Sequence, residues 1–235
     1  MDVGHGYQVT ERQTERTEQK LLGETLEIVK TDGYLFDYVS LCVDEGSKLC
    51  ILGQNGCGKS TLLRLLAKKE QPIEGSIYHP PGLQVGYFDQ LLVDTLIEET
   101  SEDVTALSYL TERFPKKSEQ DLRGELTSFG LNPTQATTCV RFLSGGERGR
   151  LCLAALMLEN PPVLCMDNPT SNLDVESVEA MVYGLSRWNG TLVFISHDAN
   201  FIRSLEAHCF VIIQNEGKLR RVEGGIDAYL KAFKM

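Results

Sequence analysis

Long apolar runs are absent from this sequence. None approaches the roughly 18 residues that a membrane-spanning helix requires, so no transmembrane segment is predicted. The first six residues, 1–6, also lack the basic-then-apolar order of a secretory signal. The seven cysteines form no C-x-x-C pair and are scattered through apolar strings. This pattern predicts reduced, buried thiols in a cytoplasmic protein.

An excess of basic residues is absent too. The 235 residues include 23 Lys and Arg against 33 Asp and Glu, which gives a net charge of −10. A protein whose own surface binds nucleic-acid phosphates usually has a basic excess, so a free-standing nucleic-acid binder is disfavoured. Docking onto a ribonucleoprotein through a local patch stays open. The hydrophobic share of 42% is typical of a soluble globular protein with a substantial core.

A glycine-rich stretch lies between an apolar run, 49–52, and a helix-forming run, 62–68. It fits the pattern G-x-x-x-x-G-K-[ST] of the Walker A phosphate-binding loop, in the strand–loop–helix context that the motif requires. We therefore predict that nine consecutive residues bind a nucleotide: Gly53, Gln54, Asn55, Gly56, Cys57, Gly58, Lys59, Ser60 and Thr61.

The residue types in this loop suit a triphosphate. Glycines let backbone N–H groups approach the phosphate oxygens, and the helix that starts near Lys59 adds its positive dipole end. Lys59 is expected to reach the β- and γ-phosphates, and the Ser60 hydroxyl is expected to bind Mg²⁺. Because Cys57 lies near both the helix start and Lys59, we expect a lowered thiol pKa and reaction with alkylating agents.

The segments before the loop predict a polar lead-in and a small β-structure. Residues 1–20 have balanced charge and no apolar stripe, so they are placed outside the core. An edge strand is predicted at 26–30, and 39–43 continues the β-structure. Between these strands, Tyr34 either stacks on adenine or packs within the hairpin, and the sequence favours neither interpretation.

The segments after the loop predict two strands and then a change of structure. Strands are predicted at 76–79 and 84–88, and Gln90 closes the second, where its amide could reach a metal-bound nucleotide. Helical spacing with polar faces then marks 91–142, which predicts a helical subdomain inserted into the α/β core.

Two further patterns follow the inserted helices. Ser144 is placed to cap the helical run 149–158, and with Gly145 and Gly146 it predicts a second anion site; a simple helix cap is the alternative. The apolar run 163–166 then ends in Asp167, which predicts a buried parallel strand that presents a carboxylate to Mg²⁺.

The last part of the chain predicts more alternating helices and strands. A helix at 175–188 leads to a buried strand at 191–195, which ends in Ser196-His197-Asp198. A hairpin at 209–222 and a helix from about residue 226 close the chain. The predicted fold is therefore α/β: a P-loop NTPase core with a parallel sheet flanked by helices, an N-terminal antiparallel β subdomain and an inserted α-helical subdomain.

In this order the motifs resemble an ATP-binding cassette of the ABC superfamily. The phosphate loop is followed by Gln90 at the Q-loop position and by 143–147, Leu-Ser-Gly-Gly-Glu, which matches the signature pentapeptide. Three later matches are Asp167 as the Walker B acid, Asp174 in the D-loop and His197 as the switch histidine.

The resemblance implies a fold, ligands and a partner. It implies one cassette over 21–235, with a core of 21–90 and 143–235 and a helical subdomain of 91–142. It implies ATP and Mg²⁺ as ligands, with Ser60, Gln90 and Asp167 around the metal. It also implies that two cassettes close head to tail, so that the signature residues Ser144, Gly145 and Gly146 meet the partner's ATP.

Within the superfamily the chain is similar to the C-terminal nucleotide-binding domain of ABC-F proteins, a group of translation-associated non-transporters. One similar stretch is 86–90 around the Q-loop. Another is 167–174, which resembles that group's Asp-Glu-Pro-Thr-Asn-His-Leu-Asp. The third, 222–230, resembles its Gly-x-Tyr-x-x-Tyr tail.

The chain also departs from the ABC-F pattern. Group members usually hold two cassettes joined by a charged helical linker, whereas this chain has one, and 1–20 resembles the end of such a linker. We therefore expect the C-terminal half of a tandem protein or a truncated relative. The superfamily's catalytic glutamate follows the Walker B acid, but here that position is Asn168, and the group's D-loop histidine is Asn172.

Asn168 bears directly on the predicted chemistry of an ABC-type ATPase. An asparagine side chain can hydrogen-bond water but cannot take its proton, so tight Mg-ATP binding with weak hydrolysis is predicted. Asp174 or His197 could partly compensate for the missing base. In the alternative interpretation another residue is the base and turnover is ordinary.

Three functions compete. The favoured one is an ABC-F-like, cytoplasmic factor in ribosome or translation work, with a second cassette as partner (a homodimer or the missing tandem half), a ribosome as a further partner, and no direct membrane insertion. The second is the ATPase subunit of an ABC transporter, which requires a transmembrane partner. The third is a regulatory module that binds ATP and a protein without useful turnover.

Overall fold

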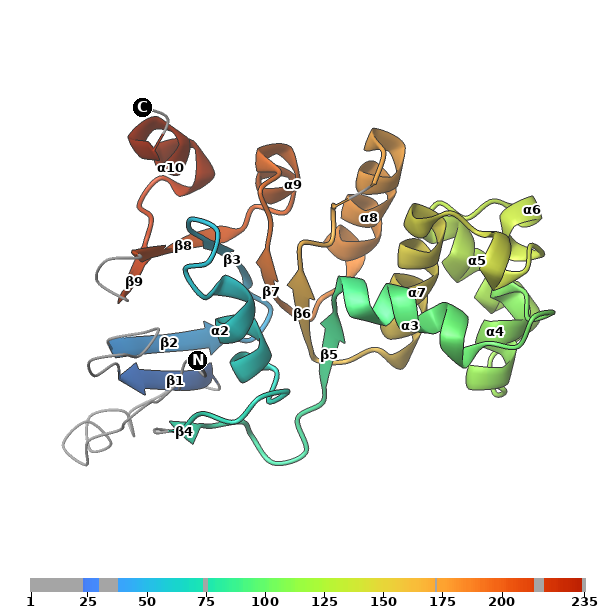
Figure 1. Ribbon diagram of the computed structural model, residues 1–235, viewed down its shortest axis with the longest axis horizontal. Helices are drawn as coiled ribbons and strands as arrows, with labels where there is room; N and C mark the ends of the chain where they lie inside the picture. The colour runs from blue at the N-terminus through green and yellow to red at the C-terminus, as the bar shows by residue number, and fades with distance from the viewer. Residues whose placement is uncertain (1–22, 30–37, 74–75, 172, 214–217, 234–235) are drawn as a thin grey trace. The chain divides into compact units, whose positions relative to one another are not determined.

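The computed structural model describes residues 23–29, 38–73, 76–171, 173–213 and 218–233. The sequence predictions for the lead-in, Tyr34 and Asn172 therefore lie outside the described residues. The chain divides into two compact units, which we describe separately (Figure 1). The first consists of Met1–Tyr87, Pro162–Met166 and Gly190–Met235, and the second of Phe88–Pro161 and Asp167–Asn189.

A six-stranded sheet forms the centre of the first unit. Its strand order is β5-β6-β7-β3-β8-β9. Strand β3 pairs in parallel with β7 and β8, whereas β8 and β9 form the predicted antiparallel hairpin, so the sheet is mixed. The bounds are β3 Lys48–Leu52, β5 Val85–Phe88, β6 Val163–Asp167, β7 Thr191–Ile195, β8 His208–Ile213 and β9 Lys218–Arg221.

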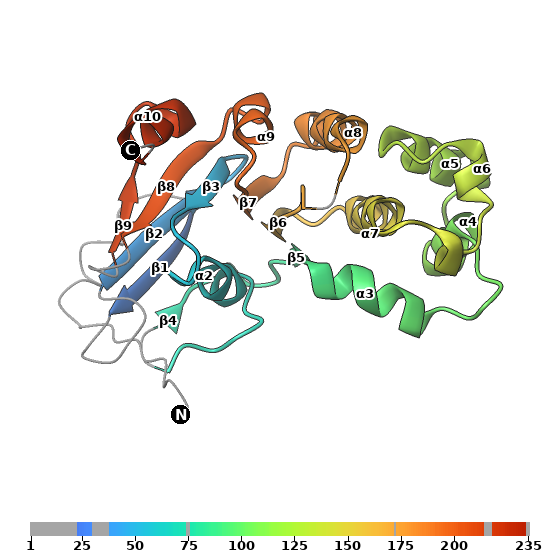
Figure 2. The same ribbon diagram turned by 45° about the horizontal axis from the view of Figure 1, so that its top comes forward.

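The central strands are largely apolar because side chains on both faces of the sheet are buried. All five positions of β7 are buried, as are four of the five in β3. Helix α2 (Lys59–Leu66) packs against the sheet through Leu62 and Leu63, neither of which is exposed to solvent (Figure 2). The phosphate loop therefore connects a fixed strand to a fixed helix.

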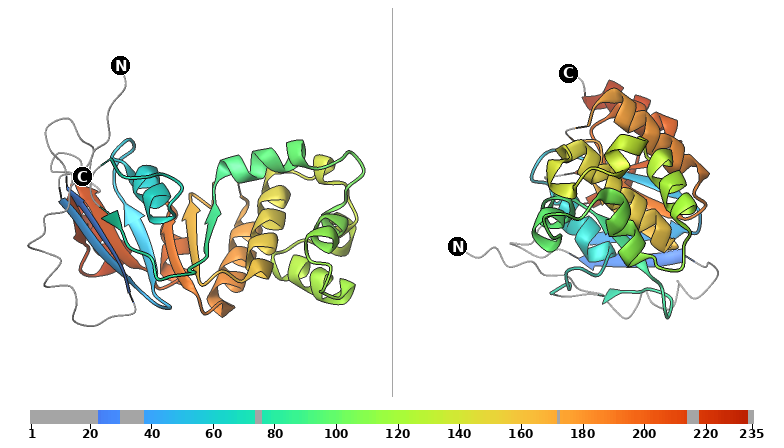
Figure 3. Two further views of the ribbon diagram at one scale, coloured as in Figure 1. Left: turned by 90° about the horizontal axis from the view of Figure 1, so that it is seen from below. Right: turned by 90° about the vertical axis from the view of Figure 1, so that its right-hand side faces the viewer.

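A smaller antiparallel sheet accompanies the larger one in the same unit (Figure 3). Its order is β2-β1-β4, with β1 Gly23–Val29, β2 Tyr38–Asp44 and β4 Ser76–Ile77. The predicted N-terminal antiparallel β-structure is confirmed. The edge position predicted for 26–30 is wrong, because β4 pairs with β1 at Leu26 and Glu27 and places β1 at the centre.

The second unit is helical, and its helices begin at side-chain caps. Capping boxes at Thr105, Ser118 and Ser144 satisfy backbone N–H groups at the starts of α4, α5 and α7. The predicted helices after Gln90 and the predicted Ser144 cap are therefore present. The bounds are α3 Gln90–Glu99, α4 Ala106–Arg113, α5 Glu119–Ser128, α6 Pro133–Ala136, η1 Val140–Phe142, α7 Gly145–Glu159 and α8 Val175–Arg187.

The start of α3 and the last helix of the chain were both predicted from the sequence. Gln90 does not close a strand: β5 ends at Phe88, and the Asp89 carboxylate accepts a hydrogen bond from the Leu92 N–H at 2.9 Å, which starts α3 at Gln90. The predicted final helix is present as α10 (Gly225–Phe233), after α9 (Ala199–Ser204). None of the helices in the described ranges is long and apolar enough to span a bilayer.

The packing of α8 gives a stability test. A Cβ built on Gly184 lies 2.5 Å from the ring of Phe129, a side chain that is 2% exposed, so no side chain fits without displacing the ring. We expect Gly184→Ala to lower the free energy of unfolding by about 1–3 kcal/mol, measured by urea denaturation.

The matched control is Gly124→Ala on α5, where the added Cβ meets nothing within 4 Å. This change should be neutral or stabilise by up to about 1 kcal/mol, because alanine is the better helix former. Equal losses of stability in the two variants would contradict the close approach of α8 to Phe129.

Candidate nucleotide-binding site

The backbone of the phosphate loop is shaped by glycine. Gly53, Gly56 and Gly58 have φ values of 147°, 80° and 100°, which residues other than glycine rarely adopt. Gly58 is the N-cap of α2, and no side chain caps the helix there. The first backbone N–H groups of α2 therefore remain available to donate hydrogen bonds to an anion.

Lys59 holds the loop together from inside. Its side chain is only 8% exposed, and its Nζ donates to the carbonyl oxygens of Gly53 and Gln54, both at 2.9 Å. An ammonium group has three donors, so two of them bind the loop and one remains for a phosphate oxygen. The lysine is thus positioned before any nucleotide arrives.

Cys57 corrects a prediction made from the sequence. Burial raises the pKa of its thiol, and the opposing influence of Lys59 is smaller. The side chain is 3% exposed, and its Sγ lies 2.7 Å from a Cβ built on Gly53, so the sulfur faces the loop interior. The expected low pKa is wrong because loss of water around the sulfur outweighs the nearby positive charge, whereas the reaction with alkylating agents stays a prediction.

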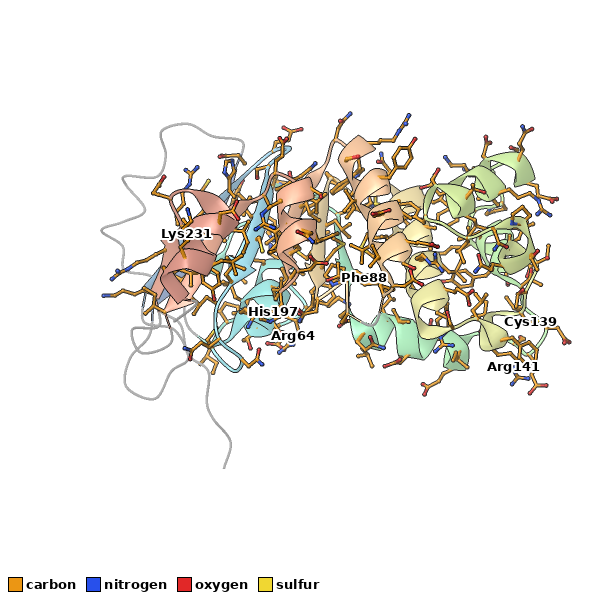
Figure 4. All side chains as sticks on the ribbon, turned by 90° about the horizontal axis from the view of Figure 1, so that it is seen from above. Arg64, Phe88, Cys139, Arg141, His197 and Lys231 are labelled. Carbon is orange, nitrogen blue, oxygen red and sulfur yellow. The ribbon has the colours of Figure 1, made fainter. Side chains whose placement is uncertain are left out.

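His197 lies on the same side of the first unit as Lys59. It follows β7 and is exposed, and Figure 4 shows it beside α2, the helix that begins with Lys59. Partial burial and then the charge of Lys59 lower its pKa, so the ring is neutral at pH 7. The Asp198 N–H donates to Ser196 Oγ at 3.1 Å, which fixes the backbone on both sides of the histidine.

Asp167 and Asn168 form a linked pair at the end of β6. The Asn168 Nδ2 donates to Asp167 Oδ1 at 2.9 Å. Asn168 also has a φ of 48°, in the left-handed region that asparagine tolerates better than most residues. Its carbonyl oxygen accepts from both the N–H and the hydroxyl of Ser171, at 3.1 and 2.7 Å, which holds the turn in place.

The two remaining catalytic candidates both lie at helix starts in the second unit. Gln90 is exposed, and its Nε2 donates to Asp94 on the next turn of α3 at 3.0 Å. Asp174 caps α8 by accepting from the Ser177 N–H at 2.7 Å. Hydrogen bonds from Ser177 lower the pKa of Asp174, which makes it a weaker base than an ordinary aspartate.

The signature residues lie at the start of α7. Ser144 Oγ accepts from the Glu147 N–H at 3.2 Å, and Glu147 accepts from the Ser144 N–H at 2.6 Å. Ser144 and Gly145 are exposed and Gly146 is half-buried. Ser144 therefore has the structural role of a cap, and its surface position leaves a role toward a partner's phosphate as a prediction.

Sequence reasoning missed the residues that support these groups. Gln135 of α6 donates to Glu147 and so braces the signature cap, and Arg150 donates to the Gly130 carbonyl at 3.1 Å from a nearly buried position. The capping pattern from Asn132 to Gln135 was a readable signal for the first. No local pattern marks the Arg150 contact, because it joins residues twenty apart.

The comparisons with known proteins assign the family. Residues 36–171, more than half of the chain, match the family described as ABC transporter. The chain belongs to this family of ATP-binding cassettes. Among solved structures it is similar to the dimeric cassette MJ0796 bound to ADP and phosphate, with 22% identity, a TM-score of 0.63, and coverage of 84% of this chain and 94% of that one. This likeness confirms the cassette fold.

The curated relatives are more specific. The chain is 36% identical to Protein GCN20 of Saccharomyces cerevisiae over 81% of its own length and 25% of that protein. It is 35% identical to ATP-binding cassette sub-family F member 3 of Rattus norvegicus over 83% of its length and 27% of that protein. The chain therefore resembles ABC-F proteins, as predicted, and spans about a quarter of the length of these relatives.

The proximity of Lys59 to His197 predicts a linked titration. Replacing Lys59 with glutamine removes a positive charge that disfavours the imidazolium form, so the pKa of His197 should rise toward its ordinary value. Burial still lowers it, so the recovery is partial. The measurement is an NMR titration of the histidine ring protons.

His79 serves as the internal control for that titration. Burial and then Lys68 lower its pKa, and it bonds to the Leu66 carbonyl at 2.8 Å. Its titration should be the same with and without Lys59. An unchanged His197 in the Lys59→Gln variant would show that the two side chains are not coupled.

Proposed function

We propose that this chain is an ABC-F-type cassette that binds Mg-ATP, closes against a second cassette and hydrolyses ATP weakly, in the cytoplasm and in work connected with the ribosome. The single observation that supports it best is the Asn168 amide hydrogen-bonded to the Walker B acid, Asp167, at 2.9 Å. The chain would therefore combine the groups that bind phosphate with an asparagine at the position of the catalytic base.

ATP binding rests on the loop around Lys59. The lysine has one donor left, Gly58 leaves the α2 N-terminus uncapped, and the loop glycines expose N–H groups. These are the groups that bind phosphate oxygens. The family to which the chain belongs consists of ATP-binding cassettes, which supports ATP as the nucleotide.

A magnesium ion fits the oxygen donors that the chain offers. Asp167 uses Oδ1 to accept from Asn168, which leaves its second carboxylate oxygen for a metal or a metal-bound water. Ser60 Oγ and the Gln90 side-chain oxygen are the other proposed ligands. The ion, when bound, would neutralise charge on the phosphates.

Weak hydrolysis follows from Asn168. Its side-chain Nδ2 donates to Asp167, and its side-chain oxygen, Oδ1, can accept a hydrogen bond from water but cannot take a proton from it. General-base help is typically worth about 10²–10⁴-fold, which sets the size of the loss. Of the two substitutes, Asp174 is disfavoured because hydrogen bonds lower its pKa, whereas His197 is neutral at pH 7 and can accept a proton.

Closure against a second cassette is supported by the exposed start of α7. Ser144 and Gly145 are exposed in this single chain, and a helix start with small residues suits a phosphate that another subunit presents. The MJ0796 cassette, a structural neighbour, is a dimer. The partner is either a second copy or the other half of a tandem protein.

The link to translation is supported by similarity rather than by geometry. GCN20 and the sub-family F protein share about a third of their aligned residues with this chain, and the tail at 222–230 fits that group. The alternative function, the ATPase subunit of a transporter, has two supports. The matched family is described as ABC transporter, and Leu91 on α3 is 66% exposed, which suits contact with an apolar partner. Sedimentation from a cell lysate distinguishes them: the proposal predicts ribosomal fractions and the alternative predicts membranes.

The decisive test is ATP turnover by the purified chain and two variants. Asn168→Glu supplies the missing base, and we expect turnover to rise by roughly 10²-fold or more. Asn168→Gln is the matched control: it has the same length and the same left-handed strain as glutamate, about 1–2 kcal/mol, but no base. It should stay as slow as the natural chain.

Size-exclusion chromatography with Mg-ATP accompanies the assay. The natural chain should dimerise with ATP and remain dimeric, because slow hydrolysis keeps the site closed. Turnover in the natural chain that already equals that of Asn168→Glu would refute the proposal of a missing base.

A further inference from the structure

Two cysteines face each other in the core of the first unit. In the parallel pairing of β3 with β8, Cys50 and Cys209 are register partners, and their side chains are 0% and 1% exposed. Register partners on adjacent strands project to the same face of the sheet at a strand spacing of about 4.7–4.9 Å. That spacing lies within the roughly 4.4–6.8 Å between Cα atoms that a disulfide spans.

The two thiols are chemically unequal. Burial raises the pKa of Cys50, and its hydrogen bond to Cys209 raises it further. The same hydrogen bond lowers the pKa of Cys209, although burial opposes this. Cys209 is therefore the better nucleophile of the two, and Cys50 lies within hydrogen-bond distance to resolve an oxidised sulfur.

The pair lies on the two strands that reach the phosphate loop. Cys50 is on β3, three residues before Gly53, and Cys209 is on β8, three residues before Ile212. A Cβ built on Gly53 lies 3.1 Å from the Ile212 carbonyl oxygen, so the loop has no free space on the side of β8. A change in the spacing of these two strands is therefore transmitted to the loop.

We propose that Cys50 and Cys209 form an oxidisable dithiol whose disulfide weakens nucleotide binding by the phosphate loop. The oxidant is a peroxide. The Cys209 thiolate attacks one peroxide oxygen, the O–O bond breaks, and the leaving hydroxide takes a proton to become water. The Cys50 thiol then attacks the resulting sulfenic acid, the S–S bond forms, and a second water leaves. The effect on the loop rests on the proposed ATP binding.

Access of the oxidant requires a local opening. Such a place is the edge strand β9, which has four residues and whose register with β8 begins at Phe210, next to Cys209. Short edge elements open at a lower free energy than central strands. Oxidation is therefore expected to be slow and to be reversed by a dithiol reductant.

The experiment uses the whole chain, first reduced and then treated with hydrogen peroxide. Differential alkylation followed by mass spectrometry identifies which cysteines are bonded, and binding of a fluorescent ATP analogue is titrated before oxidation, after it, and after reduction. We expect a Cys50–Cys209 disulfide and an affinity that is lower by about five- to tenfold and recovers on reduction.

Three variants make the result specific. Cys50→Ala and Cys209→Ala should each abolish both the disulfide and the change in affinity. Cys165→Ala, which removes an equally buried thiol from β6, should keep both. Since Cys57 lies in the loop itself, a peroxide effect that persists in Cys209→Ala would assign the change to Cys57 and overturn the proposal.

Two other outcomes also overturn it. One is a reduced pair at peroxide doses that oxidise the exposed Cys42. The other is a disulfide that forms without any change in affinity. The proposed function fails separately: if the reduced natural chain does not bind the ATP analogue, ATP binding is refuted whatever the thiols do.

Discussion

The positive charge of Lys59 is the constraint around which the nucleotide end of the first unit is arranged. An ammonium group that is 8% exposed must be hydrogen-bonded, and the carbonyl oxygens of Gly53 and Gln54 supply two acceptors at 2.9 Å. In the same loop Gly53 has a φ of 147°, which residues other than glycine rarely adopt. The same charge reaches His197 and helps to keep its ring neutral. The loop is therefore preorganised, and ordering it costs little when phosphate binds.

The proposed phosphate-binding groups and the position of the family's catalytic base belong to different units of this chain. The groups expected to grip phosphate lie in the loop and at the start of α2, in the first unit. The position of the family's catalytic base, Asn168, lies in the second unit, in a turn held by Ser171. Under the proposed function, phosphate binding and turnover are therefore set by residues at two separate places in the chain.

Local sequence patterns were enough to predict most elements. The glycine spacing predicted the loop, and Ser144 ahead of the helical run 149–158 predicted a cap that the structure contains. The failures share a cause, since each depends on a partner far away in sequence or on burial. Strand β1 is central because β4 returns to pair with it, and the pKa of Cys57 is raised by burial, which outweighs the charge of Lys59. The residue types alone could not show that the Asn168 side chain donates a hydrogen bond to Asp167.

The inward-facing sulfur of Cys57 also matters for chemical probes. A cysteine inside a nucleotide-binding loop looks like an anchor for covalent inhibitors built on an adenosine scaffold. Here its side chain is 3% exposed and belongs to the buried apolar core that also contains Ile212. An electrophile carried on a nucleotide would therefore meet a sulfur that is shielded from solvent. Selective covalent compounds for this cassette would therefore need a different nucleophile, such as the exposed Cys42.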